Sequence, residues 1–332
     1  MTQTSEKSYL SFGDFVDAYY KIKVKGIHFI LSKIRMVSNE NRVASKWDSY
    51  VSISDFWVIP EIKKYWNTRI SGNSETIYED YVHQKYLQNK SNLRFLSIGC
   101  GSGGHERNFA KYSNFSKLVG IDVSAESIKV AKNRALEHNY NIDYHCDDFF
   151  RLDFGKQQFD VILFNASLHH FENINDFLRQ NITPLLDTNG LVVVFEYCGP
   201  NRLQWRKSQL KKANALLQKM PRRYKLRVDG LATKQKVYRP GMLRMLLVDP
   251  SEAPDSANLV KALQNNFDIL EETKLGWNIL HILLKDIAHN FLNEELQTKL
   301  LLQELIREEE NFVRVNQEND AIFGVYQKRE II

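Results

Sequence analysis

Two adjacent histidines and one glutamate are the side chains of this chain best suited to acid–base chemistry. His169 and His170 follow the apolar run Phe159 to Phe164, and Glu196 lies near the end of the run Gly190 to Tyr197. Imidazole and carboxylate groups accept protons near neutral pH, and ligands bind at the carboxyl ends of strands in open α/β sheets. We therefore treat all three as candidate catalytic bases. The structural alternatives are a helix cap or ligand packing for the histidines and a supporting role for Glu196.

A glycine-rich turn precedes these residues. The segment Leu96 to Gly104 reads LSIGCGSGG and follows an apolar run that begins at Leu93. Glycines tolerate positive φ and let the backbone approach a ligand closely. At the end of a strand this pattern predicts a nucleotide-like ligand, while a dinucleotide loop and a merely structural turn stay open as alternatives.

Acidic residues follow the turn in an order that suits an adenosyl group. Asp122 ends the run VGID, where one carboxylate can accept both hydroxyls of a ribose. Asp147, Asp148 and Phe149 then bring an acid and an aromatic ring together, which can hold an adenine by hydrogen bonding and stacking. Asp122 alone fits a dinucleotide equally well, so the later acids favour the adenosyl ligand.

Alternating strands and helices are expected to position these groups. The pattern predicts a doubly wound α/β fold with a mostly parallel sheet that is covered on both faces. The expected strands are Leu93–Ile98, Lys117–Ile121, Ile142–His145, Phe159–Phe164, Gly190–Tyr197, Phe267–Thr273 and Ala321–Gln327. The expected helices of this part are Gly104–Tyr112, Ala125–His138, Ile174–Leu186, Asn258–Asn265, Trp277–Leu292 and Glu294–Val315.

Four parts are expected along the chain. Residues 1–90 form an N-terminal helical extension or lid, with helices over 12–37 and 75–88, and residues 91–199 form the cofactor-binding core. Residues 200–258 form a basic cap insertion. Residues 259–332 complete the core and carry a helical insertion.

The cap is strongly basic, because Asp229 is its single acid between residues 202 and 248. Its cations are Arg202, Arg206, Lys207, Lys211, Lys212, Lys219, Arg222, Arg223, Lys225, Arg227, Lys234, Lys236, Arg239 and Arg244. Such side chains can attract and orient an anionic substrate, here called the acceptor, that binds beside the adenosyl ligand. A run of charges on a helix is, however, commonly just its solvent-exposed face. We expect Tyr197, Arg202, Arg239 and Trp277 to bind the acceptor. RNA stays open as a partner, but the chain shows no recognised RNA-binding module.

Composition narrows the class of protein further. The chain has 332 residues, a net charge of +5 and only three cysteines, Cys100, Cys146 and Cys198, which favours a reducing, cytoplasmic location. It contains no run of about 18 apolar residues, so we expect no membrane span. No histidine or cysteine spacing predicts a metal site. A homodimer is an open alternative to a monomer.

The order of these motifs resembles that of class I S-adenosylmethionine-dependent methyltransferases of the small-molecule type. The resemblance covers about residues 91 to 199 and is carried by IGCGSG, VGIDVS, the D-D-F run, FDVILFNASLHHF and GLVVVFEY. It implies a seven-stranded sheet whose last strand is antiparallel and lies between the fifth and sixth. It also implies S-adenosyl-L-methionine as cofactor, with S-adenosyl-L-homocysteine as product. The residues expected to contact the cofactor are Gly99, Cys100, Gly101, Gly103, Asp122, Val123, Asp147, Asp148, Phe149 and Asn165.

The resemblance assigns parts of the cofactor to these residues. The three glycines would surround the methionine part, Asp122 would bind the ribose, and Asp148 with Phe149 would hold the adenine, with Asp147 as the alternative acid. One position departs from the pattern: many members carry an acid two residues before the first glycine, where this chain has Ser97. Other acids, or backbone carbonyls near Asn165, would then have to bind the ammonium group of the cofactor.

The expected activity is methyl transfer to an oxygen or nitrogen atom of an anionic or glycan-like small molecule, free or tethered to a carrier. Methyl transfer is an in-line displacement that depends on positioning, and a base is required only where the acceptor loses a proton. The alternatives are an RNA methyltransferase, a nicotinamide-dependent oxidoreductase and a cofactor-binding protein without catalysis. The glycines deviate by one residue from dinucleotide spacing, and the run after Phe164 lacks the Asn-Pro-Pro-aromatic pattern of enzymes that methylate base amines.

Overall fold

The structure is a computed structural model that describes residues 9–16, 55–230 and 232–329. Most of the helix expected over residues 12–37 therefore lies outside the described residues. Among the described residues, no helix is both long enough and apolar enough to cross a lipid bilayer.

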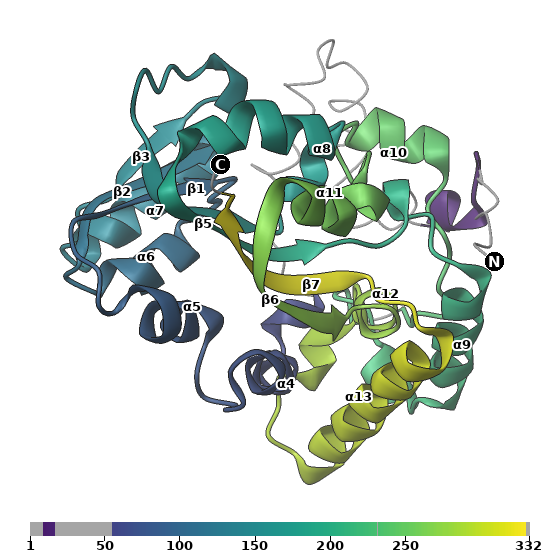
Figure 1. Cartoon of the computed structure of the whole chain (residues 1–332). Helices are drawn as coiled ribbons and strands as arrows, with labels where there is room; N and C mark the ends of the chain where they lie inside the picture. Colours follow the sequence, from purple (N-terminus) through teal and green to yellow (C-terminus); the bar gives the residue numbers. More distant parts are fainter. Residues whose placement is uncertain (1–8, 17–54, 231, 330–332) are drawn as a thin grey trace.

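A seven-stranded sheet in the order β3-β2-β1-β4-β5-β7-β6 forms the centre of the molecule (Figure 1). The strands are β1 (Leu93–Ile98), β2 (Phe115–Asp122), β3 (Asp143–Cys146), β4 (Phe159–Asn165), β5 (Leu186–Tyr197), β6 (Phe267–Gly276) and β7 (Ala321–Lys328). Strands β1 to β5 pair in parallel, whereas β7 is antiparallel to both β5 and β6. The predicted doubly wound, mostly parallel sheet is confirmed, together with the antiparallel last strand between the fifth and sixth.

Helices cover both faces of this sheet. They are α4 (Pro60–Ser71), α5 (Tyr78–Val82), α6 (Gly104–Ala110), α7 (Ala125–Glu137), α8 (Ile174–Phe177), α9 (Lys207–Lys219), α10 (Met242–Val248), α11 (Leu259–Asn266), α12 (Leu280–Leu284) and α13 (Leu296–Asn316). In Figure 1, α8 and α11 lie above the sheet, and α4 and α13 lie below it. Because side chains alternate along a strand, Val161 and Leu163 of β4 pack in the layer with α4 and α13. Ile162 and Phe164 pack in the layer with α8 and α11.

The helix expected over Trp277–Leu292 is broken into two short pieces, so that prediction is wrong. Helix α12 covers Leu280–Leu284, and a separate helical turn covers Ala288–Phe291. Trp277 and Asp286 have φ values of 64° and 68°, which a right-handed helix cannot include. The break places Trp277 and α12 beside the carboxyl end of β5.

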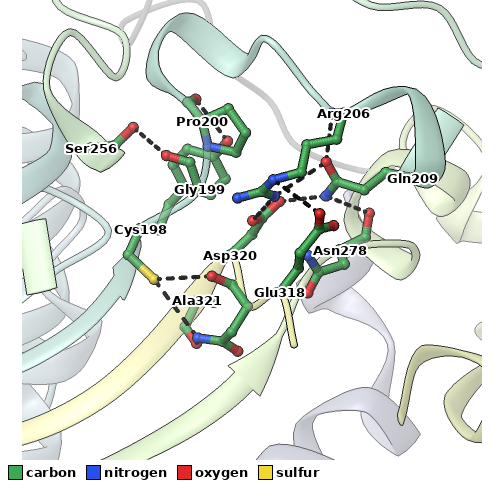
Figure 2. A network of polar contacts seen from close by, with 12 residues as sticks. Cys198, Gly199, Pro200, Arg206, Gln209, Ser256, Asn278, Glu318, Asp320 and Ala321 are labelled. Carbon is green, nitrogen blue, oxygen red and sulfur yellow. Dashed lines mark hydrogen bonds and ion pairs between the residues drawn. The ribbon is translucent and has the colours of Figure 1, made fainter. Parts of the chain in front are cut away.

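A buried polar network ties the cap to the sheet (Figure 2). Nη1 of Arg206 bonds Oδ1 of Asp320 at 2.7 Å, and the amide of Gln209 donates to the other oxygen of that carboxylate. Asp320 is fully buried directly before β7, where burial raises its pKa and the Arg206 charge opposes the rise. On the same side, the hydroxyl of Ser256 donates to the carbonyl of Gly199 at 2.9 Å. The start of the cap is therefore fixed to the end of β5 and the start of β7.

Candidate active site

The glycine turn after β1 packs tightly on two sides and is open on a third. Gly99, Gly101 and Gly103 have φ values of +75°, +54° and +72°, which favour glycine. A Cβ at Gly99 would lie 2.5 Å from Cβ of Ser167, and one at Gly103 would lie 2.2 Å from the hydroxyl of Tyr144. Among the residues that the structure describes, no atom lies within 4 Å of a Cβ built at Gly101. The first and third glycines thus allow packing, and the second faces open space.

Asp122 lies directly beside the turn at the end of β2. Its Oδ2 accepts the N–H of Gly101 at 2.8 Å, and its Oδ1 accepts the N–H of Ser124 at 2.8 Å. These bonds fix the carboxylate beside the glycine turn. Val123, the next residue, is exposed.

The D-D-F run follows β3 at the same edge of the sheet. The N–H of Asp147 donates to the carbonyl of Asp122 at 3.1 Å, and Asp148 accepts the N–H of Phe150 at 3.0 Å. Phe149 is buried in an aromatic cluster, whereas Phe150 is 63% exposed. Phe149 therefore serves as a core residue in this structure, and both acids stay beside the sheet edge.

Asn165 is the last residue of β4, the strand beside β1, and Tyr78 contacts it. The side-chain amide of Asn165 donates to the hydroxyl of Tyr78 at 2.8 Å, and that hydroxyl lies 3.0 Å from Nδ1 of His105. Tyr78 comes from α5, so the N-terminal part, which was expected to form an extension or lid, reaches the end of β4. Tyr78 itself was not among the predicted site residues. Burial raises the pKa of the Cys100 thiol well above its ordinary value, and the thiol is therefore neutral.

A buried carboxylate holds His169. Glu196 is fully buried, and its Oε1 accepts the N–H groups of Ser167 at 2.5 Å and Leu168 at 2.6 Å. Its Oε2 lies 2.7 Å from Nδ1 of His169. Because Glu196 accepts two backbone N–H groups, we assign Nδ1 of His169 as its third donor, which leaves Nε2 as the basic nitrogen. Nε2 of His169 lies 3.6 Å from Oε1 of Glu252.

His170 and Glu252 complete a cluster that the sequence did not predict. Nδ1 of His170 lies 3.1 Å from the carbonyl of Ser251, and its ring centroid lies 4.3 Å from that of His169. One ligand atom each from His169, His170 and Glu252 falls within 4.8 Å of the others, a spacing that could hold a metal ion. Glu252 lies in the Asp249–Glu252 run, far along the chain from both histidines, so no local spacing reveals the cluster.

An aromatic wall of Tyr197, Trp205, Trp277 and His281 lies beside His169. The ring of His281 is 6.0 Å from those of Tyr197 and Trp205 and 6.1 Å from that of Trp277. The ring of Tyr197 is 6.1 Å from that of His169. Nε1 of both tryptophans and Nδ1 of His281 are buried, and none of them has a hydrogen-bond partner in the described part of the chain. The wall thus combines flat apolar faces with three unmatched polar atoms.

His281 should make the protein less stable in acid. Burial lowers its pKa to about 3, from 6.5 in the unfolded chain. Below pH 6.5 the unfolded chain takes up a proton that the folded protein refuses, so stability falls as the pH falls towards 3. We expect the free energy of unfolding, measured in urea, to fall between pH 7 and pH 5 by about 2 kcal/mol less in His281→Leu than in the wild type.

His138→Leu is the matched control, because His138 lies exposed at the end of α7. This variant should show the same difference between the two pH values as the wild type. A His281→Leu variant that loses as much stability as the wild type would contradict the assignment.

Arg202 and Arg239, two residues expected to bind the acceptor, contact the chain itself. The guanidinium of Arg202 donates to the carbonyls of Pro250 and Glu252, and Nε of Arg239 donates to the carbonyl of Trp205 at 2.7 Å. Other cap cations pair with acids: Arg206 with Asp320, Lys212 with Glu308, Arg223 with Glu295, Arg227 with Asp286 and Arg244 with Asp14. Much of the cap's charge is therefore balanced within this chain.

Comparison with known proteins defines the class of this domain. Residues 89–243 match the family model described as a methyltransferase domain. Together with the strand order and the glycine turn, this match identifies the core as a class I S-adenosylmethionine-dependent methyltransferase domain.

Two curated relatives illustrate the match. The ubiquinone biosynthesis O-methyltransferase of Bradyrhizobium sp. (strain ORS 278) is 29% identical over 151 residues, which cover 44% of this chain and 58% of that protein. Its counterpart from Coxiella burnetii (strain RSA 493 / Nine Mile phase I) is 35% identical over 112 residues, which cover 33% of this chain and 47% of that protein. The chain thus spans about half the length of these curated relatives.

Solved structures are similar at lower identity. The [4+2]-cyclase SpnF is 16% identical with a TM-score of 0.44, covering 76% of this chain and 79% of that chain. The plantazolicin methyltransferase BpumL, in complex with a triazolic desmethylPZN analog and S-adenosylhomocysteine (SAH), is 16% identical with a TM-score of 0.41. That match covers 80% of this chain and 85% of the other.

Proposed function

We propose that this protein is an S-adenosylmethionine-dependent methyltransferase that transfers a methyl group to a hydroxyl of a small, ring-bearing molecule. The observation that carries the proposal is the Glu196–His169 pair, which lies at the carboxyl edge of the sheet beside the glycine turn. The hydroxyl of Ser167 joins the two features, because it donates to the carbonyl of Ile98 at 2.6 Å.

The open space over Gly101 and the carboxylate of Asp122 suit the adenosyl cofactor. In this proposal the glycine turn with Cys100 and Asn165 holds the methionine part, and Asp122 with Val123 holds the ribose. Asp147 or Asp148 accepts a hydrogen bond from the exocyclic amine of the adenine. When bound, the cofactor supplies an electrophilic methyl group on a sulfonium.

His169 is the general base of the proposed reaction. A hydroxyl acceptor must lose its proton as its oxygen bonds to the methyl carbon, and Nε2 of His169 takes that proton. Glu196 orients the ring and stabilises the imidazolium through Nδ1, and the carboxylate of Glu252 adds negative charge 3.6 Å from Nε2. General-base assistance of this kind contributes about a hundred- to ten-thousandfold in rate.

The aromatic wall favours a ring-bearing acceptor. Aromatic faces bind planar rings and the apolar faces of sugars, and the indole N–H groups and the His281 nitrogen can pair with hydroxyls. Arg202 and Arg239 hold backbone carbonyls, which weakens the electrostatic case for an acceptor chosen by its negative charge. The O-methyltransferase names of the curated relatives support oxygen as the acceptor atom.

Two measurements test the proposal. Calorimetry with SAH and with NAD should show binding of the first ligand alone, and binding of NAD alone would overturn the cofactor assignment. Methyl transfer from labelled S-adenosylmethionine should then be followed on phenols, sugars, nucleotide sugars, carrier-tethered acids and RNA. Label on RNA only, or on carrier-tethered acids only, would refute a ring-borne hydroxyl as acceptor.

Chelation should leave turnover unchanged. If Nε2 of His169 takes the proton, the cluster of His169, His170 and Glu252 works without a cation. Rates on the acceptor found by the screen should be equal before and after treatment with EDTA. A loss that Mg²⁺ or Zn²⁺ restores would instead make this cluster a metal site.

A further inference from the structure

Glu106 is a buried acid whose two carboxylate oxygens meet no partner at full hydrogen-bond geometry among the described residues. It lies in the first turn of α6 and is fully buried, and the hydroxyl of Ser97 is the side-chain donor that acts on it. An unpaired polar group costs about 1–3 kcal/mol, and a charged one costs more. Burial accordingly raises the pKa of Glu106, with the charge of His105 and the hydroxyl of Ser97 opposing the rise. Buried polar groups are nearly always paired, so this carboxylate calls for an explanation.

Glu106 lies close to Cys100 in the glycine turn and to Ser97 in β1. Burial raises the pKa values of the Cys100 thiol and the Tyr144 hydroxyl, and the nearby Glu106 charge raises both further. Cys100 belongs to the turn, and Tyr144 packs where a side chain at Gly103 would lie. Ser97, two residues before Gly99, is buried, and its hydroxyl acts on the Glu106 carboxylate.

The neighbouring cations are committed elsewhere. Nδ1 of His105 lies 2.7 Å from Oε1 of Glu79 and 3.0 Å from the hydroxyl of Tyr78. The guanidinium of Arg107 donates to the carbonyl of Ser102 at 2.8 Å. Among the residues that the structure describes, neither cation hydrogen-bonds the Glu106 carboxylate.

We infer that Glu106 binds the ammonium group of the cofactor's methionine part, in place of the acid that β1 lacks at Ser97. The inference rests on the proposed function, since it assumes the adenosyl cofactor. An ammonium carries three N–H donors and one positive charge, which suit a buried carboxylate. The carboxylate then comes from α6 instead of from β1, while it serves the same side of the glycine turn.

A pair of ligands separates this role from a structural one. SAH contains the ammonium, whereas 5′-methylthioadenosine lacks the whole amino-acid part. In calorimetry, Glu106→Gln should lower the affinity for SAH by about 10- to 100-fold, the range for a hydrogen bond to a charged group. The affinity for 5′-methylthioadenosine should stay within about twofold, because the adenosine contacts are unchanged.

Moving the acid back to β1 provides a rescue. The double variant Ser97→Asp with Glu106→Gln should regain most of the lost SAH affinity. If Glu106→Gln does not fold, Glu106→Asp tests the same difference, since it keeps the charge but shortens the reach by one methylene. Melting curves of the unliganded variants check folding, and Glu106→Gln should melt no lower than the wild type.

Each outcome has one meaning. Unchanged SAH affinity in the variant that folds overturns the inference, and so does an equal loss for both ligands, which would make Glu106 a support of the turn. Failure of the double variant to regain affinity also counts against it. If the wild type binds neither ligand, the proposed function itself fails.

Discussion

Replacement of His169 by glutamine should lower kcat about a hundred- to ten-thousandfold, the full contribution of a general base. Glutamine can still donate to Glu196 but cannot take a proton from the acceptor. The affinity for SAH should stay close to that of the wild type, because His169 lies on the acceptor side. Steady-state rates on the acceptor found by the screen, with calorimetry on the same preparations, measure both quantities.

His170→Gln is the matched control, since the two histidines are neighbours with touching rings. Its Nδ1 lies near the Ser251 carbonyl, and Glu196 bonds the other ring. This variant should lose far less activity than His169→Gln. Glu196→Gln should fall between them, because the amide keeps one acceptor but no longer fixes the tautomer of His169. A larger loss in His170→Gln would transfer the role of base to that residue.

Replacement of Asp122 by alanine should lower the affinity for SAH about a hundredfold or more, equivalent to about 3 kcal/mol of binding free energy. The change removes the proposed acceptor of the ribose hydroxyls. It also leaves the N–H groups of Gly101 and Ser124 without the oxygens that now accept them at 2.8 Å. Calorimetry measures the affinity, and circular dichroism verifies that the sheet is intact.

Two variants show what the loss means. Asp143→Ala removes an exposed acid at the start of the adjacent strand β3 and should leave SAH affinity unchanged. Asp122→Asn keeps one acceptor oxygen, so its affinity for SAH should lie between those of the wild type and the alanine variant. If Asp122→Ala binds SAH as the wild type does, the ribose lies elsewhere.

The strands, and the site residues that follow them, could be predicted from local sequence patterns. Parallel strands covered on both faces need continuous apolar runs, so Leu93–Ile98 was predicted with the bounds that β1 has. The predicted start of β5 at Gly190 is wrong, because the strand begins at Leu186 and runs through polar residues that carry no strand pattern. The glycine turn and Asp122 could be predicted because each directly follows its own strand.

The charge of the cap shows a limit of composition. The excess of arginine and lysine between residues 202 and 248 suggested a surface for anions. The acids that pair with these cations lie far along the chain, as Asp320 does for Arg206. Charge can be counted in a sequence, but the fold decides which charges meet.

The sequence by itself determined the sheet, the glycine turn and the acids that follow it, because these depend on periodicity and on residues adjacent to one strand. Only the tertiary structure placed Glu252 beside His169, built the aromatic wall from β5, the cap and α12, and turned Glu106 towards Ser97. Those contacts depend on how helices and loops pack on the sheet, and no local pattern records that packing. The missing acid at Ser97 was visible in the sequence, whereas the carboxylate that we infer to replace it became visible only in the fold.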